Sequence, residues 1–103
     1  IQIKIAESAT ELEAARLLVY RGMQLVDRGA RCDTQTSMAK LFATEAAVRI
    51  THRCLEVFGA HGLSPEYPIE RLFRDARVMT VPDGTSDIQR LLIARNLTGM
   101  AAY

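Results

Sequence analysis

One carboxylate of this chain stands in a setting that suits proton transfer. Asp83 lies between Pro82 and Gly84, and two hydroxyl residues, Thr85 and Ser86, follow at once. A carboxylate held within hydrogen-bond reach can act as a general base toward a carbon next to a thioester carbonyl. Burial beside apolar groups would raise its pKa and make it a stronger base. Pro-Asp-Gly is also a common turn signal, so a role confined to the turn is the alternative.

The residues after Gly84 combine two properties of a helix N-terminus. Ser86 and Gln89 have the S-x-x-Q spacing of a capping box, which predicts that a helix begins here. The free N–H groups at such an end also suit an anionic phosphate. We therefore expect Thr85, Ser86 and Asp87 to supply the cap of the last helix, and a cap does not exclude anion binding there.

The histidines and cysteines do not form a metal or redox motif. His52 has Glu56 four residues later but no second ligand, so a surface or packing pair is expected rather than a metal site. Cys32 and Cys54 lack metal and redox spacing, which favours a reducing compartment. The glycines of segment 58–62 predict a helix end and are, by themselves, a weak signal for nucleotide binding.

Length and composition limit the classes of protein to consider. The chain has 103 residues, which predicts one small domain, and 49% of them are apolar, enough for a core. The 13 basic and 12 acidic residues nearly balance, which argues against a nucleic-acid partner. No apolar run has the roughly 18 residues of a membrane span, and no signal-peptide pattern is present. Because the chain opens on Ile1 and at once resembles a helix, we expect a piece of a longer polypeptide.

Apolar periodicity and end signals predict four helices. In the first, a row of large apolar residues and a parallel row of small residues each recur every seven positions, namely Ile5, Leu12, Val19 and Val26, and Ser8, Ala15 and Gly22. This pairing suits close packing on another helix. Gly29 is the expected C-cap of this helix, and Asp33 or Thr34 is the expected N-cap of the next. The expected helices span about 2–28, 35–58, 68–78 and 86–98.

The second expected helix is apolar over more than half of its circumference, which predicts a central place among the others. Pro65 and Pro68 interrupt the chain after it, and a proline suits the first turn of the short helix that follows. The predicted fold is therefore all-α, an up-and-down four-helix bundle with one shorter arm.

Four segments resemble parts of the C-terminal helical domain of the acyl-CoA dehydrogenases, which are flavin-dependent, and they follow one another in the same order as in that family. They are residues 6–21, 38–47, 66–76 and 84–90. The resemblance implies that residues 1–103 are one domain of a larger flavoprotein, whose N-terminal helical domain and middle β-domain are absent from this sequence. It also implies FAD as cofactor and an acyl-CoA thioester as substrate.

The same resemblance assigns roles to particular residues. Asp83 occupies the position of the catalytic base, where the family commonly has glutamate, and Gly84 is a substrate contact. The implied FAD contacts form two groups, one after the base and one at a helix end that meets the flavin of a neighbouring subunit. These contacts are Thr85, Ser86 and Asp87, and Glu56, Val57, Phe58, Gly59 and Ala60.

Two functions follow as hypotheses. The first is α,β-dehydrogenation of an acyl-CoA with Asp83 as base, an electron-transfer flavoprotein or similar acceptor, and a dimer or tetramer in the bacterial cytoplasm or the mitochondrial matrix. On this hypothesis the isolated fragment is inactive. The second is a helical oligomerisation module without catalysis, which Asp83 in place of glutamate, Pro82 in place of an aromatic residue and the altered turn at Ala60 favour.

Overall fold

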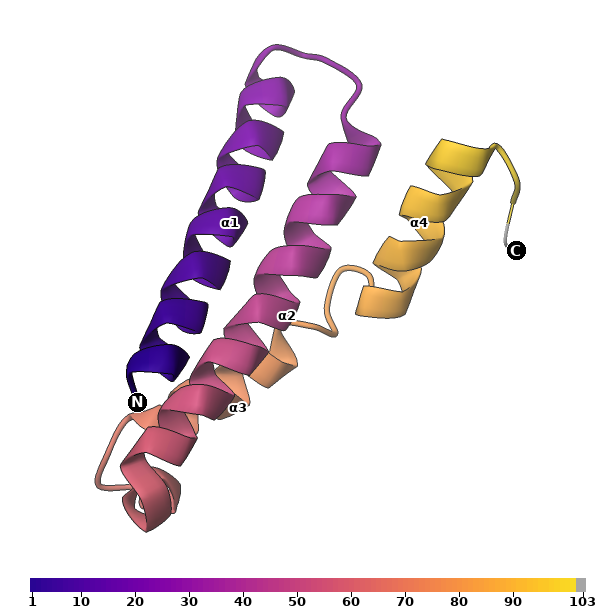
Figure 1. The fold of residues 1–103 in the computed structure, drawn as a ribbon. Coiled ribbons are helices and arrows are strands. Elements are labelled where there is room, and N and C mark those ends of the chain that lie inside the picture. Colours follow the sequence, from indigo (N-terminus) through magenta and orange to yellow (C-terminus); the bar gives the residue numbers. More distant parts are fainter. Residues whose placement is uncertain (102–103) are drawn as a thin grey trace.

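The computed structural model describes residues 1–101, and within them the regular structure is entirely helical. The elements are α1 (Gln2–Asp27), α2 (Asp33–Phe58), a short 3₁₀ helix η1 (Gly59–Leu63), α3 (Ile69–Val78) and α4 (Ser86–Thr98) (Figure 1). The predicted all-α fold with four helices is confirmed.

Helix α2 is the centre of the fold. Helices α1, α3 and α4 each pack against α2, and in the described part of the chain α4 contacts neither α1 nor α3 (Figure 1). The predicted central position of the second helix is thereby confirmed. The molecule is elongated, with principal extents of 47 × 27 × 22 Å.

Helices α1 and α2 meet through small residues. Ala15 and Gly22 are the buried residues of α1, and Gly22 faces Thr36 and Ala39 of α2. A Cβ atom on Gly22 would lie 3.8 Å from the Cβ of Ala39, which is ordinary contact distance, so the helix axes approach closely. The row of large residues lies beside this contact, where Leu12 stays 45% exposed.

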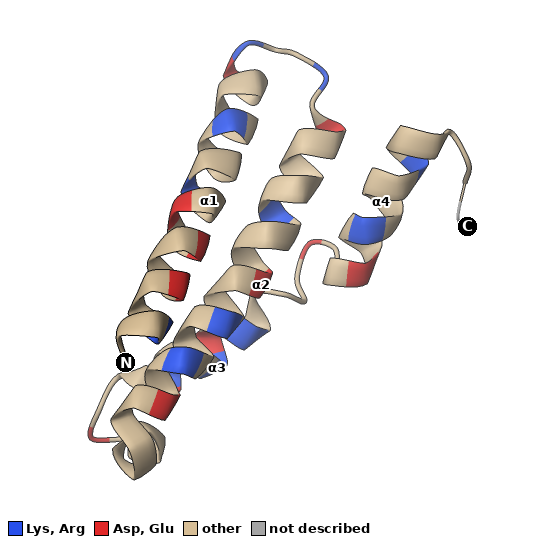
Figure 2. Ribbon diagram, viewed as in Figure 1, with Lys and Arg blue, Asp and Glu red and all other residues tan. Residues whose placement is uncertain are grey.

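An ion cluster joins the same two helices. The Glu11 carboxylate of α1 accepts hydrogen bonds from Arg53 at 2.7 Å and from Arg49 at 3.0 Å, both on α2. The hydrogen bond from Arg53 is the main reason that the pKa of Glu11 lies below its ordinary value. Figure 2 shows the acidic residues of this part of α1 next to basic residues of α2.

The first interhelix connection confirms the left-handed conformation expected at Gly29, which follows the C-cap Arg28, and corrects the expected N-cap of the next helix. Gly29 has a φ of +69°, and the N–H groups of Gly29 and Ala30 donate to the carbonyls of Val26 and Leu25, which is a Schellman ending. Helix α2 begins at Asp33, and its N-cap is Cys32, so the predicted cap at Asp33 or Thr34 is wrong. The Asp33 carboxylate lies in the first turn, where its negative charge interacts favourably with the positive end of the helix dipole. It makes no capping hydrogen bond.

Helix α4 begins at Ser86 as predicted, but its cap is Thr85. The Thr85 hydroxyl accepts a hydrogen bond from the Ile88 N–H at 3.2 Å, which confirms that a hydroxyl of this segment caps the helix. The predicted capping box of Ser86 and Gln89 is wrong, because the Ser86 hydroxyl donates to Glu45 of α2 and the Gln89 amide turns toward the preceding loop.

Candidate functional site

The predicted base lies in the loop that joins α3 to α4. Asp83 is exposed there and has a φ of +56°, and it is the one non-glycine residue with a positive φ in residues 1–101. Aspartate tolerates the left-handed region better than most residues, because its short side chain can bond locally. Gly84 follows with a φ of +96°, so two successive residues turn the chain sharply.

Side chains from α2 and α4 hold this turn by its backbone. The Lys40 ammonium of α2 donates to the Gly84 carbonyl at 2.5 Å. The amide of Gln89, which is only 6% exposed, donates to the same carbonyl at 3.4 Å and to the Asp83 carbonyl at 3.5 Å. The turn is therefore anchored while the Asp83 side chain faces solvent.

A second pair of contacts fixes the start of α4. The Ser86 hydroxyl donates to the Glu45 carboxylate of α2 at 2.5 Å, and the Ser86 N–H donates to the Thr80 carbonyl at 3.2 Å. Thr80 is 3% exposed and also bonds the Arg77 side chain. The sequence analysis missed these partners; the charged Lys40 and Glu45 within the apolar α2 were the signal that could have indicated them.

Beside this anchor lies a polar hollow of about 270 Å³. Thr85, Ser86 and Asp87 all line it, so the structure brings the first group of predicted FAD contacts together. Two guanidinium groups, Arg77 and Arg90, share the hollow, and Arg90 donates to the Asp87 carboxylate at 2.8 Å. Asp83 is outside the residues that line it. Hydroxyls, two cations and a helix N-terminus share the hollow with the carboxylates of Glu45 and Asp87, and this mixed set of donors and acceptors fits a polyhydroxylated group.

The second group of predicted FAD contacts lies at the other end of α2. Glu56, Val57 and Phe58 form its last residues, and Gly59, with a φ of +61°, is its C-cap. Ala60 follows in η1, and all five residues are exposed. The exposed set is thus a contiguous surface around a helix end.

The Glu56 carboxylate is already paired. It accepts a hydrogen bond from the Lys4 ammonium of α1 and lies 3.4 Å from the His52 imidazole. The bond from Lys4 is the main reason that the pKa of Glu56 lies below its ordinary value. The predicted His52–Glu56 pair is present, and the described residues hold no group of side chains that could bind a metal ion.

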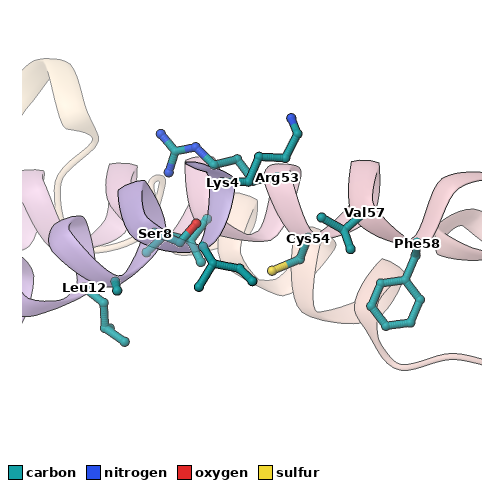
Figure 3. Close-up of a pocket in the computed structure, with 10 residues that line it drawn as sticks. Lys4, Ser8, Leu12, Arg53, Cys54, Val57 and Phe58 are labelled. Atoms are coloured by element: carbon teal, nitrogen blue, oxygen red, sulfur yellow. The ribbon is translucent and has the colours of Figure 1, made fainter. Parts of the chain in front are cut away.

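An apolar groove of about 330 Å³ begins at this helix end and runs between α1 and α2. Val57 and Phe58 line it together with residues of both helices (Figure 3). Ile5 and Leu12 contribute from α1, and Cys54 contributes from α2. The groove is open to solvent, and large apolar side chains line it.

The two groups of predicted contacts do not meet within one chain. The first is anchored at Glu45 and the second is centred on Val57, and twelve residues of α-helix span about 18 Å. The structure thus separates two regions. Residues 85–87 line the hollow at the start of α4, with Asp83 and Gly84 in the turn before it, and residues 56–60 lie at the other end of α2.

The described helices do not include one that is long and apolar enough to cross a membrane. Comparison with known proteins relates the chain to one family: the family described as "Acyl-CoA dehydrogenase, C-terminal domain" matches residues 1–98.

Curated relatives and solved structures agree with this match. The cyclohexane-1-carbonyl-CoA dehydrogenase of Geobacter metallireducens is 49% identical over 99% of this chain and 27% of its own length. The mitochondrial short-chain specific acyl-CoA dehydrogenase of Rattus norvegicus is 45% identical over 94% of this chain and 24% of its own. The structure of butyryl-CoA dehydrogenase from Megasphaera elsdenii superposes with a TM-score of 0.91 at 32% identity, over 93% of this chain and 25% of the other. The chain spans about a quarter of the length of the relatives it matches.

Proposed function

This chain belongs to the acyl-CoA dehydrogenase family, and on that premise we propose that it is the C-terminal domain of an enzyme that forms a double bond between the α and β carbons of an acyl-CoA thioester. The observation that carries the proposal is the Asp83–Gly84 turn, because Lys40 and Gln89 hold its backbone and leave the Asp83 carboxylate exposed. A carboxylate on a fixed backbone is the arrangement that general-base catalysis needs.

In this proposal the Asp83 carboxylate accepts the proton from the α carbon. The C–H electron pair becomes the π bond as the β carbon loses a hydride, so the substrate is oxidised by two electrons. A bound FAD, the cofactor this family uses, would supply the acceptor for that hydride. Gly84, next to the base, is the proposed substrate contact, through its backbone.

The donor sets support two separate FAD contacts. Thr85, Ser86 and Asp87 line a hollow that Arg77, Arg90 and Glu45 share, and its mixture of donors and acceptors fits a sugar hydroxyl. The surface formed by Glu56, Val57, Phe58, Gly59 and Ala60 lies about 18 Å away along α2 and suits a second FAD held by a neighbouring subunit. The pairing of Glu56 with Lys4 offsets the charge that would repel a pyrophosphate.

The proposal includes the partners of the larger protein. The open groove between α1 and α2 supports assembly into a dimer or tetramer, because exposed apolar patches of this kind favour association. We expect an electron-transfer flavoprotein or similar acceptor, and a bacterial cytoplasmic or mitochondrial matrix location. The isolated chain lacks the domains that complete the flavin and acyl-CoA sites, so we expect it to be inactive.

The test is spectroscopic and uses the full-length protein that carries this domain. We expect it to be yellow as purified, with a flavin absorption band that bleaches when an acyl-CoA is added without oxygen. A colourless, folded oligomer that takes up no added FAD would instead support the alternative, a helical oligomerisation module. A yellow protein that no acyl-CoA bleaches would contradict dehydrogenation while leaving flavin binding intact.

A further inference from the structure

The carbonyl of Gly84 accepts hydrogen bonds from two side chains of different helices. Lys40 donates from α2 at 2.5 Å, and Gln89 donates from α4 at 3.4 Å. A carbonyl oxygen has two lone pairs, so these donors use its full capacity. The bond to a charged donor is the shorter one, as expected for a charge-assisted hydrogen bond.

Fixing this carbonyl also fixes the peptide plane between Gly84 and Thr85. The peptide unit is planar and trans, so its N–H points opposite to its C=O. On the other side of Gly84, the Gln89 amide donates to the Asp83 carbonyl at 3.5 Å, so the peptide plane between Asp83 and Gly84 is held as well. That restriction matters because Asp83 is held at a φ of +56°, a conformation that costs free energy for a residue with a side chain.

Lys40 is free for this task. The ion pairs formed within residues 1–101 do not include a carboxylate partner for its ammonium. Its side chain is partly buried and lines a hollow together with Val19 and Gly22 of α1. The hydrogen bond to the Gly84 carbonyl is therefore the polar contact that its ammonium makes within the described residues.

We propose that Lys40 is a positioning residue, which holds the Asp83–Gly84 turn so that the Asp83 carboxylate keeps the direction needed for proton transfer. The proposal rests on the proposed function for the reaction that Asp83 performs. Lys40 acts through the backbone of Gly84 and does not touch the substrate. Its loss therefore lowers the rate of the chemical step more than it weakens substrate binding.

The experiment compares substitutions in the full-length flavoprotein. Lys40→Met keeps the apolar stem and removes the donor, and Lys40→Arg keeps a cationic donor. The matched control is Arg74→Met, which removes a cation from an exposed pair with Glu70 on α3, away from the turn. We expect Lys40→Met to lower kcat for acyl-CoA-dependent flavin reduction about 10- to 100-fold, because small misplacements of a catalytic group have effects of this size. KM should change less than about threefold, Lys40→Arg should recover most of the rate, and Arg74→Met should leave it unchanged.

A second readout does not depend on the reaction. The Ser86 N–H bonds the Thr80 carbonyl across the turn, so its hydrogen exchange reports whether the turn stays closed. We expect Lys40→Met to speed this exchange at least about tenfold. If Lys40→Met leaves the hydrogen exchange of the Ser86 N–H unchanged, the proposal is overturned. It is also overturned if the exchange becomes faster while kcat of the enzyme stays the same.

The two hypotheses fail in different ways. If the unsubstituted flavoprotein is not reduced by any acyl-CoA, the proposed function fails, and Ser86 exchange alone decides whether Lys40 holds the turn. If Lys40→Met does not fold, Lys40→Gln replaces it, because its shorter polar side chain cannot keep the same reach. The same two readouts then apply.

Discussion

The side-chain amide nitrogen of Gln89 lies 2.7 Å from the position that a Cβ atom on Gly84 would take. From this position Gln89 donates to the carbonyls of Asp83 and Gly84. The amide can lie this close only because Gly84 has no side chain. The turn that carries the candidate base is thus built around a contact that only glycine permits.

Gly84→Ala should therefore destabilise the chain in two ways. Alanine is strained at a φ of +96°, and its Cβ would displace Gln89. We expect the free energy of unfolding to fall by about 1–3 kcal/mol. Gly99→Ala is the matched control, since Gly99 has a φ of +73° but no atom within 4 Å of its Cβ position. Chemical denaturation followed by circular dichroism should show the larger loss for Gly84→Ala; equal losses would mean that the contact with Gln89 contributes nothing.

At Gly22, in contrast to Gly84, substitution by alanine should raise the free energy of unfolding. Its Cβ position is at ordinary contact distance from Thr36 and Ala39, and alanine favours a helix interior more than glycine. Gly22→Ala should thus stabilise the chain by about 0.5–1 kcal/mol. Gly22→Leu should destabilise it by about 1–3 kcal/mol, because the larger side chain forces α1 away from α2. Denaturation midpoints of the two variants on opposite sides of the unsubstituted value would confirm the close packing.

Acid should weaken the contact between α1 and α2. The pKa of Glu11 is lower in the folded chain than its ordinary value, so its contribution is present above about pH 4.3 and is lost as pH falls through the folded value. Glu11→Gln should therefore flatten the loss of stability as pH falls below the ordinary pKa of a glutamate. Glu13→Gln, exposed on the same helix, is the control. The Glu56 carboxylate and the Arg74 partner of Glu70 are more exposed than Glu11 and Arg53, so these two pairs should matter less. If the acid limb of the Glu11→Gln denaturation profile matches that of the unsubstituted chain, the Glu11–Arg53 pair does not stabilise the fold.

Asp83→Asn tests the base in the full-length enzyme. Asparagine keeps the size of the side chain and tolerates a positive φ, but it cannot accept the proton. Acyl-CoA-dependent flavin reduction should fall at least about 10²-fold, while flavin binding and the thermal midpoint change little. Asp83→Glu is the companion variant, because it gives the longer reach that the family commonly uses, and we expect an altered rate or acyl preference. Full activity in Asp83→Asn would assign the base to another part of the enzyme.

The open groove should make the isolated chain self-associate. Ile5 and Leu12 of α1 remain 61% and 45% exposed, although both are large apolar residues. We expect dimers or larger species at micromolar concentration in sedimentation, and the double variant Ile5→Lys and Leu12→Lys should raise the apparent Kd at least about tenfold. Leu97→Lys, at an exposed leucine of α4, is the control. A monomeric unsubstituted chain would count against association through this face.

Local chemistry was enough to predict the helices. Residues three, four and seven apart define the apolar faces, and the caps lie within a few residues of the ends they serve, so Gly29 and the start of α4 at Ser86 follow from neighbours in the chain. The all-α fold and the central place of α2 depend on the same short-range patterns.

Tertiary structure decided which partner each polar group took. A serine hydroxyl can cap a helix, but the Ser86 hydroxyl donates to Glu45 of α2 instead. Thr85 therefore caps α4, because its hydroxyl accepts from the Ile88 N–H. Lys40 and Gly84 are 44 positions apart in the sequence, so no periodicity could have joined them. The row of small residues, rather than the large row beside it, faces α2 because only small side chains let two helix backbones approach closely. Which groups pair depends on the distances between helices. The packing of the helices sets those distances, and residue spacing along the chain does not reveal them.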